Sequence, residues 1–86
     1  MAHDHPAADN VYLFDARGIA KRFRHPAIFG ALNALEPGET MRFQNDHQPL
    51  PLLAQIEQYF GPHIKVSHVA REPGNVIIDF LVVSTE

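Results

Sequence analysis

The sequence predicts one α+β domain, a two-layer sandwich in which two helices cover one face of a four-stranded mixed sheet. Its 86 residues are too few to support two hydrophobic cores. Apolar residues recur with strand or helix spacing in successive segments, in the order β-α-β-α-β-β. The right-handed crossover rule makes the first two strands parallel neighbours. The fourth strand is the most apolar and is expected inside the sheet, which gives the strand order 1-2-4-3.

The first strand is predicted at Val11–Phe14, a short apolar run that ends at Asp15 and is expected to be buried. Residues 1–10 before it show no apolar periodicity and are expected to form a flexible tail. The folded domain is therefore expected to span residues 11–84.

The first helix is predicted to begin at Pro26, because proline has a suitable fixed φ and its missing N–H has no intrahelical partner there. Residues 16–25 before it would form a long basic connection, and long connections are often functional. Gly30 inside the helix costs about 1 kcal/mol relative to alanine, so either the backbone lies close to a neighbour or the cost is tolerated. The buried face of this helix is expected to consist of Ile28, Phe29, Leu32 and Leu35.

The second half of the chain predicts a strand, a helix and a hairpin. Thr40–Asn45 alternates as a half-buried strand does. The second helix begins between His47 and Pro51 and ends at Gly61. The third strand covers residues 64–69, the turn has proline and glycine placed for type II, and the fourth strand covers residues 76–83.

Composition excludes several classes of protein. With 45% hydrophobic and 20% charged residues the chain is expected to fold. It has no apolar run of about 18 residues and no signal-peptide pattern, so a cytoplasmic protein without a membrane span is expected. The absence of cysteine excludes disulfides, thiolate metal ligands and a cysteine nucleophile. A formal charge of −3 makes general binding to nucleic acid unlikely.

Two histidines stand at corresponding places in this predicted fold. His25 follows the first strand and directly precedes Pro26, and His47 follows the second strand and precedes Pro49. The carboxyl ends of parallel strands open on one edge of the sheet, which is where such folds collect ligands. The topology therefore predicts that His25 and His47 are neighbours.

Three motifs resemble the bacterial domain-of-unknown-function family 2249 (DUF2249) over residues 12–83. They are Arg24-His25-Pro26 with Ile28 and Phe29, then Leu35-x-Pro37-Gly38-Glu39, then Asn45-Asp46-His47-x-Pro49-x-Pro51-Leu52 and Gln55. Members of this family often occur with hemerythrin-like or other metal and redox domains, so the resemblance implies a metal or redox context.

Residues 14–19 and the Pro-Gly-Glu turn are more distantly similar to the TusA and SirA group of sulfur carriers. That group has the same β-α-β-α-β-β order, and a Cys-Pro at its first helix holds persulfide sulfur. The corresponding phrase here is His25-Pro26, and without any cysteine we do not expect a persulfide carrier.

A divalent transition metal is the first candidate ligand, because neutral imidazole is a common ligand of Zn, Cu, Ni and Fe(II). His25 and His47 would bind it, with Asp46 or Asp15 as a third ligand. The cations of residues 17–24 oppose such a site, because they would repel a dication. In the structural alternative, both rings hydrogen-bond to loop backbone and Asp46 caps the second helix.

A small anion or an acidic partner protein is the second candidate, bound by the basic segment 17–24. Free N–H groups at Ala27 and Ile28 and the helix dipole would assist, although Pro26 removes one donor. The positive side chains of this site would be Arg17, Arg22 and Arg24.

We expect a binding or accessory protein, monomeric or weakly dimeric, rather than an enzyme. The alternatives are an enzyme that uses His25 and His47 as acid and base, and a protein- or RNA-interaction module built on residues 17–24.

Overall fold

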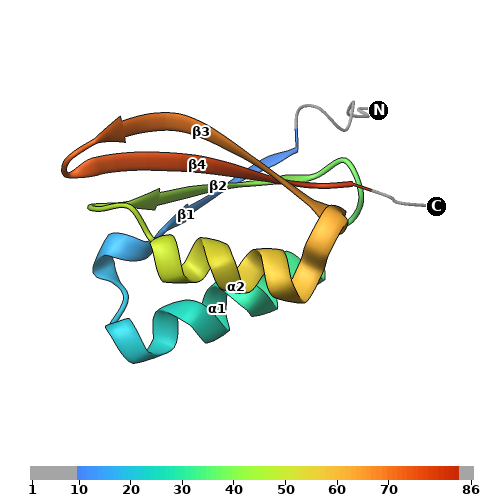
Figure 1. Cartoon of the computed structure of the whole chain (residues 1–86), viewed down its shortest axis with the longest axis horizontal. Coiled ribbons are helices and arrows are strands. Elements are labelled where there is room, and N and C mark those ends of the chain that lie inside the picture. Colours follow the sequence, from blue (N-terminus) through green and yellow to red (C-terminus); the bar gives the residue numbers. More distant parts are fainter. Residues whose placement is uncertain (1–9, 84–86) are drawn as a thin grey trace, which may run out of the picture.

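The computed structural model describes residues 10–83 and has the predicted two layers, with two α-helices on one face of a four-stranded sheet (Figure 1). The predicted tail, residues 1–10, lies outside the described residues apart from Asn10. In chain order the elements are β1 (Val11–Asp15), η2 (Ala16–Gly18), α1 (Lys21–Ala34), β2 (Thr40–Asn45), α2 (Leu50–Phe60), η3 (Gly61–His63), β3 (Ile64–Glu72) and β4 (Asn75–Val82).

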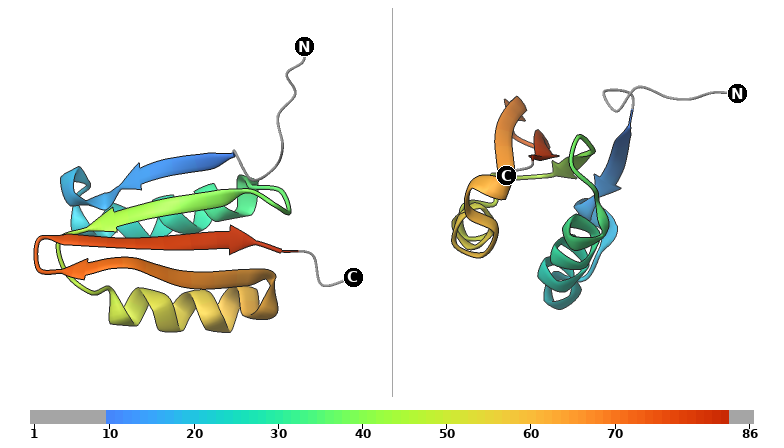
Figure 2. Two further views of the ribbon diagram at one scale, coloured as in Figure 1. Left: turned by 90° about the horizontal axis from the view of Figure 1, so that it is seen from above. Right: turned by 90° about the vertical axis from the view of Figure 1, so that its right-hand side faces the viewer.

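The sheet has the predicted strand order, β1-β2-β4-β3. β1 and β2 are parallel, with Phe14 opposite Phe43, and β4 runs antiparallel to both β2 and β3. Figure 2 shows that both helices lie on the same face, α1 beneath β1 and β2 and α2 beneath β3 and β4. The prediction that the fourth strand lies inside the sheet is confirmed, since β4 has a neighbour on each side.

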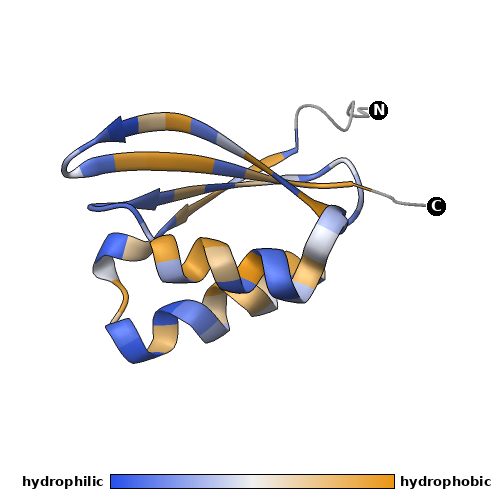
Figure 3. Ribbon diagram, viewed as in Figure 1, coloured by the Kyte–Doolittle hydropathy of each residue, from blue (hydrophilic) through white to orange (hydrophobic). Residues whose placement is uncertain are grey.

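The hydrophobic core lies between the sheet and the two helices, where Figure 3 shows hydrophobic colouring along β4 and α2. Phe43 and Phe80 are its largest side chains, with ring centroids 5.8 Å apart. The helices contribute apolar residues that are spaced so that they lie on one face, Ile28 and Leu32 from α1 and Leu52 and Ile56 from α2. The remaining large buried residues are Ile28, Leu32, Met41, Leu52, Ile56, Ile64, Val76 and Ile78.

The strand predicted at Val11–Phe14 is confirmed as β1, but the prediction that it is buried is wrong. β1 is an edge strand, and Leu13 is 79% exposed because it lies on the face of the sheet opposite to the helices, in register with Arg42. Only Phe14 is partly buried, and it stacks against Phe43 with 6.3 Å between the ring centroids. A short apolar run does not distinguish a central strand from an edge strand, because both contain the same residue types.

The predicted start of the first helix at Pro26 is also wrong. α1 begins at Lys21 and contains Pro26 in its interior. The expected basic connection, residues 16–25, is thus replaced by η2 and the first turns of α1. Pro26 cannot donate a hydrogen bond to the carbonyl of Arg22, and the helix continues through it because Ile28 and Leu32 on the following turns are packed in the core. Arg24 Nε donates to the carbonyl of Ile19 at 2.7 Å. His25 therefore lies within α1 and not at its N-terminus.

The predicted start of the second helix between residues 47 and 51 is confirmed, since α2 begins at Leu50 with Pro51 in its first turn. Gly61 at its end has φ +58, and Gly74 in the β3–β4 turn has φ +81, as a type II turn with Pro73 before it requires. β3 is longer than predicted and contains a register shift between His68 and Ala70. Within the described residues, neither helix is long and apolar enough to cross a membrane.

Gly30 provides a test of the packing of α1. It is exposed in the helix, and a Cβ atom at this position would meet nothing within 4 Å, so the backbone makes no close approach there. We expect Gly30→Ala to raise the free energy of unfolding by about 0.5–1 kcal/mol, because alanine loses less conformational freedom in a helix. Urea unfolding measured by circular dichroism would show this. Gly74→Ala serves as the contrast and should lower stability, because its φ is +81. An unchanged or lower stability of Gly30→Ala would contradict the prediction.

Candidate functional site

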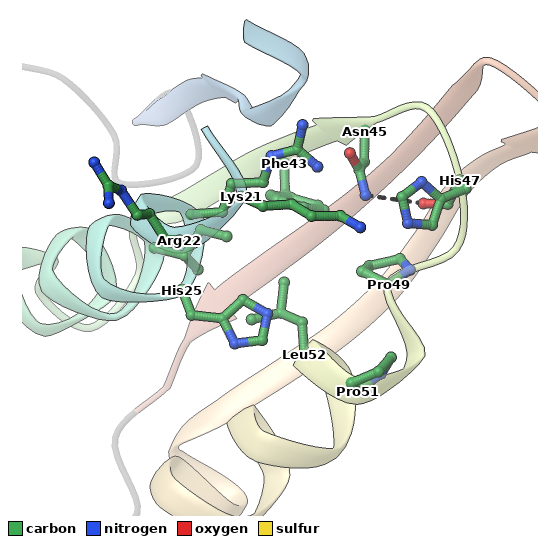
Figure 4. A pocket seen from close by; sticks show the side chains of 11 residues that line it. Lys21, Arg22, His25, Phe43, Asn45, His47, Pro49, Pro51 and Leu52 are labelled. Atoms are coloured by element: carbon green, nitrogen blue, oxygen red, sulfur yellow. Dashed lines mark hydrogen bonds between the residues drawn. The ribbon is translucent and has the colours of Figure 1, made fainter. Parts of the chain in front are cut away.

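A pocket of about 670 Å³ opens between the N-terminal part of α1 and the loop that joins β2 to α2 (Figure 4). Its floor is apolar, because Ile28, Phe43 and Leu52 reach it from the core. Its rim is polar and mainly basic. The lining residues are Lys21, Arg22, Arg24, His25, Ile28, Phe43, Asn45, His47, Pro49, Pro51 and Leu52.

The structure brings both predicted histidines to this pocket, although α1 starts earlier than expected. His25 and His47 line it, and so do Arg22 and Arg24. The other residues predicted for the site, Asp15, Arg17 and Asp46, do not line it. Ligand binding by any of these residues stays a prediction.

His25 faces the second helix. Its Nδ1 atom lies 2.8 Å from Oε1 of Gln55 in α2, which links the two helices beside the pocket. Because an amide oxygen can only accept a hydrogen bond, Nδ1 carries the hydrogen in this geometry. The Nε2 atom of the neutral ring then keeps its lone pair and can accept a hydrogen bond or bind a metal.

His47 is held by its own loop. Its Nδ1 atom lies 2.6 Å from Oδ1 of Asp46, and this hydrogen bond lowers the pKa of Asp46 below its ordinary value. The backbone carbonyl of His47 accepts a hydrogen bond from Nδ2 of Asn45 at 3.0 Å, and the carbonyl of Asp46 accepts one from Gly74 N at 2.8 Å. The loop is thus anchored to β2 and to the hairpin, while both side chains of the pair are more than half exposed.

The cations at the pocket differ in what they contact. Arg24 is partly buried and is oriented by its bond to the carbonyl of Ile19. Arg22 lies over the ring of Phe23, 4.8 Å from the centroid, and Figure 4 shows it pointing away from the two histidines. Lys21 is exposed at the rim. Lys21 and Arg24 are therefore the cations best placed to act on a molecule in the pocket.

The predicted metal ligands do not form a complete site. Residues 10–83 contain no group of three or more His, Cys, Asp or Glu side chains placed to hold a metal ion. The carboxylate of Asp15 is bound by Arg17 and that of Asp46 by His47. Neither of these carboxylates lines the pocket with His25 and His47.

Two polar residues of the site were missed by the sequence prediction. Asn45 is 3% exposed, and its Oδ1 atom is buried without a hydrogen-bond partner among the described residues. A signal for it exists, because Asn45 continues the inward alternation of Met41 and Phe43 and is therefore a polar residue at a core position. Gln55 is part of the third motif that resembles the family, but its contact with His25 was not predicted, since the two residues lie on different helices.

Comparison with known proteins identifies a family for this chain. The profile of a family described as "Uncharacterized conserved protein (DUF2249)" matches residues 13–82. No curated protein and no solved structure matches the chain.

Asp15 and Arg17 provide a test of the charge distribution beside the pocket. Arg17 Nε and Nη2 each donate to the Asp15 carboxylate at 2.9 Å, and these bonds lower the pKa of Asp15 from 3.8 to about 2. The folded pKa lies below the unfolded one, so the pair stabilises the fold above pH 3.8, and this contribution is lost as the pH falls toward 2. We expect Arg17→Met to return the pKa of Asp15 toward 3.8, as measured by NMR titration of the carboxyl carbon.

Arg71→Met is the matched control, because Arg71 lies on β3 away from this pair, and it should leave the pKa of Asp15 at about 2. An Asp15 pKa that does not change in Arg17→Met would show that Arg17 is not its cause.

Proposed function

We propose that this chain, which belongs to the DUF2249 family, is a small binding protein and that the pocket between α1 and α2 takes an organic anion. The observation that carries the proposal is the combination of a basic rim with an apolar floor, without any acidic side chain among the lining residues.

The charge of the pocket is opposite to that of the whole chain. The formal net charge is −3, yet Lys21, Arg22 and Arg24 line the pocket and no Asp or Glu does. Clustered charges of one sign in a partly enclosed site raise the local concentration of ions of the opposite sign. An anion is therefore the class of ligand that this electrostatic environment favours.

The start of α1 adds to this preference. No side chain caps the helix at Ala20, and its first turn contains no acidic residue, so no negative side chain of this turn compensates the positive end of the helix dipole beside Lys21 and Arg22. The N–H groups expected to assist anion binding, at Ala27 and Ile28, lie inside the helix, and those of Lys21 and Arg22 take their place. α2 is also uncapped, although Pro51 offers no N–H there.

The apolar floor indicates that the anion has an apolar body. Ile28, Phe43 and Leu52 would contact such a body, while a bare inorganic ion would leave them exposed to water. A volume of about 670 Å³ is in the usual range of small-molecule sites. A carboxylic acid with an aromatic or branched aliphatic group matches both parts of the pocket.

A transition metal is the second candidate, favoured by the way the histidines are held. Each Nδ1 atom faces a side-chain oxygen, that of Gln55 for His25 and that of Asp46 for His47, which leaves Nε2 available as metal-ligating histidines require. The candidate is weaker because two imidazoles do not complete a site and the nearby cations would repel a dication.

The likeness to the sulfur carriers does not extend to their chemistry. A persulfide relay requires a cysteine, and the sequence has none. Two alternatives stay open, acid–base catalysis by His25 and His47 and an interaction with RNA. No geometric feature of the pocket specifically favours either of them.

The anion proposal is tested with 3-phenylpropionate and its neutral amide. We expect the carboxylate to bind and to shift the backbone amide NMR signals of residues 21–28 and 45–52, and the amide to bind at least about tenfold more weakly, because charge-assisted hydrogen bonds are lost. Lys21→Gln and Arg24→Gln should each lower the affinity for 3-phenylpropionate by a similar factor. Lys65→Gln and Arg71→Gln on β3 are matched controls and should bind normally. Equal affinity for acid and amide, or no shifts near the pocket, would overturn the proposal.

Titration with Zn²⁺ tests the second candidate. On the anion proposal, we expect no stoichiometric shift of the His25 and His47 ring signals, because a third ligand is missing. Coordinated shifts of both rings that are lost in His25→Ala and in His47→Ala would favour the metal site over the anion site.

A further inference from the structure

Asn45 is a polar residue at the junction of the core and the pocket. It is the last residue of β2, is 97% buried, and lines the pocket beside Phe43 and His47. Its Nδ2 atom donates to the carbonyl of His47 at 3.0 Å, whereas its Oδ1 atom has no partner among the described residues. Figure 4 shows this oxygen on the side of the amide away from His47.

The orientation of this amide is determined by its surroundings. If it were flipped, Oδ1 would face the carbonyl oxygen of His47, and two acceptors would oppose each other. The amide therefore keeps its nitrogen on His47 and presents an unpaired acceptor. A buried carbonyl without a donor is unfavourable and is rare in folded proteins, so such a group calls for a specific partner.

His25 adds a second acceptor to the same pocket. With Nδ1 donating to Gln55, Nε2 is an acceptor when the ring is neutral. The polar groups of the pocket thus comprise the cations of α1 and the acceptor atoms of Asn45 and His25. A ligand that satisfies both kinds of group carries a negative charge and, close to it, a hydrogen-bond donor.

We infer that the ligand is a 2-hydroxy carboxylic acid with an apolar side chain, whose hydroxyl donates to Oδ1 of Asn45. The inference rests on the proposed anion site and specifies its ligand. The donor is a hydroxyl rather than an ammonium group. An ammonium group beside the ligand's carboxylate would be positively charged, and Lys21 and Arg24 would repel it. Oδ1 is covered in the structure, so the contact also requires a neighbouring side chain of the pocket wall to move aside.

The test compares 3-phenyllactate with 3-phenylpropionate, which differ by the one hydroxyl group. We expect wild-type protein to bind 3-phenyllactate at least about tenfold more tightly, because a site with an unpaired acceptor rejects a ligand that lacks the donor. The side-chain amide signals of Asn45 should shift with 3-phenyllactate and not with 3-phenylpropionate. In Asn45→Ala the two affinities should become equal, because the affinity for 3-phenyllactate falls while that for 3-phenylpropionate stays unchanged.

Gln44→Ala is the matched control, because Gln44 is the neighbouring residue on β2, does not line the pocket, and contacts Asn75. It should keep the wild-type preference. If Asn45→Ala fails to fold, the inference is still tested by the two ligand affinities of the wild-type protein and by the side-chain amide signals of Asn45.

The outcomes distinguish a failure of the 2-hydroxy acid inference from a failure of the proposed anion site. Equal wild-type affinities with unmoved Asn45 signals would overturn the inference and leave the anion site intact. Tighter binding of phenylalanine than of 3-phenyllactate would overturn the choice of a hydroxyl. Binding of neither acid would overturn the anion site together with the inference.

Discussion

Parallel pairing of β1 with β2 is the constraint on which the geometry of this molecule depends. Because the two strands run in one direction, the chain must cross back along α1 between them, and both strands end at the same edge of the sheet. Both helices consequently begin at that edge, and the space between their first turns becomes the pocket. An antiparallel hairpin at this point would have needed no crossover helix and would have separated His25 from His47.

The inward face of β2 connects the core to the pocket. Met41 and Phe43 are buried in the core, and the next inward position is Asn45, where the apolar packing gives way to a hydrogen bond with the His47 carbonyl. This bond ties the β2–α2 loop to the most rigid part of the sheet, since β2 is paired on both sides. One wall of the pocket is therefore held by the core, while Lys21 and Arg22 on the opposite wall are exposed and free to adjust to a bound molecule.

The sequence predicted the topology well because the rules involved do not depend on exact boundaries. The same-edge argument for His25 and His47 held even though α1 begins at Lys21 and not at Pro26, since a helix that starts a turn earlier still starts after β1. Proline is only unfavourable inside a helix, and tertiary packing of Ile28 and Leu32 outweighs that preference. The exposure of β1, the Gln55 contact and the unpaired oxygen of Asn45 could not be predicted in this way, because each depends on neighbours distant in the sequence.

The departures from ideal local chemistry gather in one region of the structure. α1 begins without a cap and without an acidic residue, and its second turn loses a backbone hydrogen bond to Pro26. α2 begins without a cap as well, and the orphan oxygen of Asn45 lies between the two helix starts. Each of these features lowers stability. Proteins usually concentrate such compromises where they bind or react. The compromises and the pocket thus share one edge of the sheet, and that coincidence argues that the edge is shaped for a ligand rather than for the fold alone.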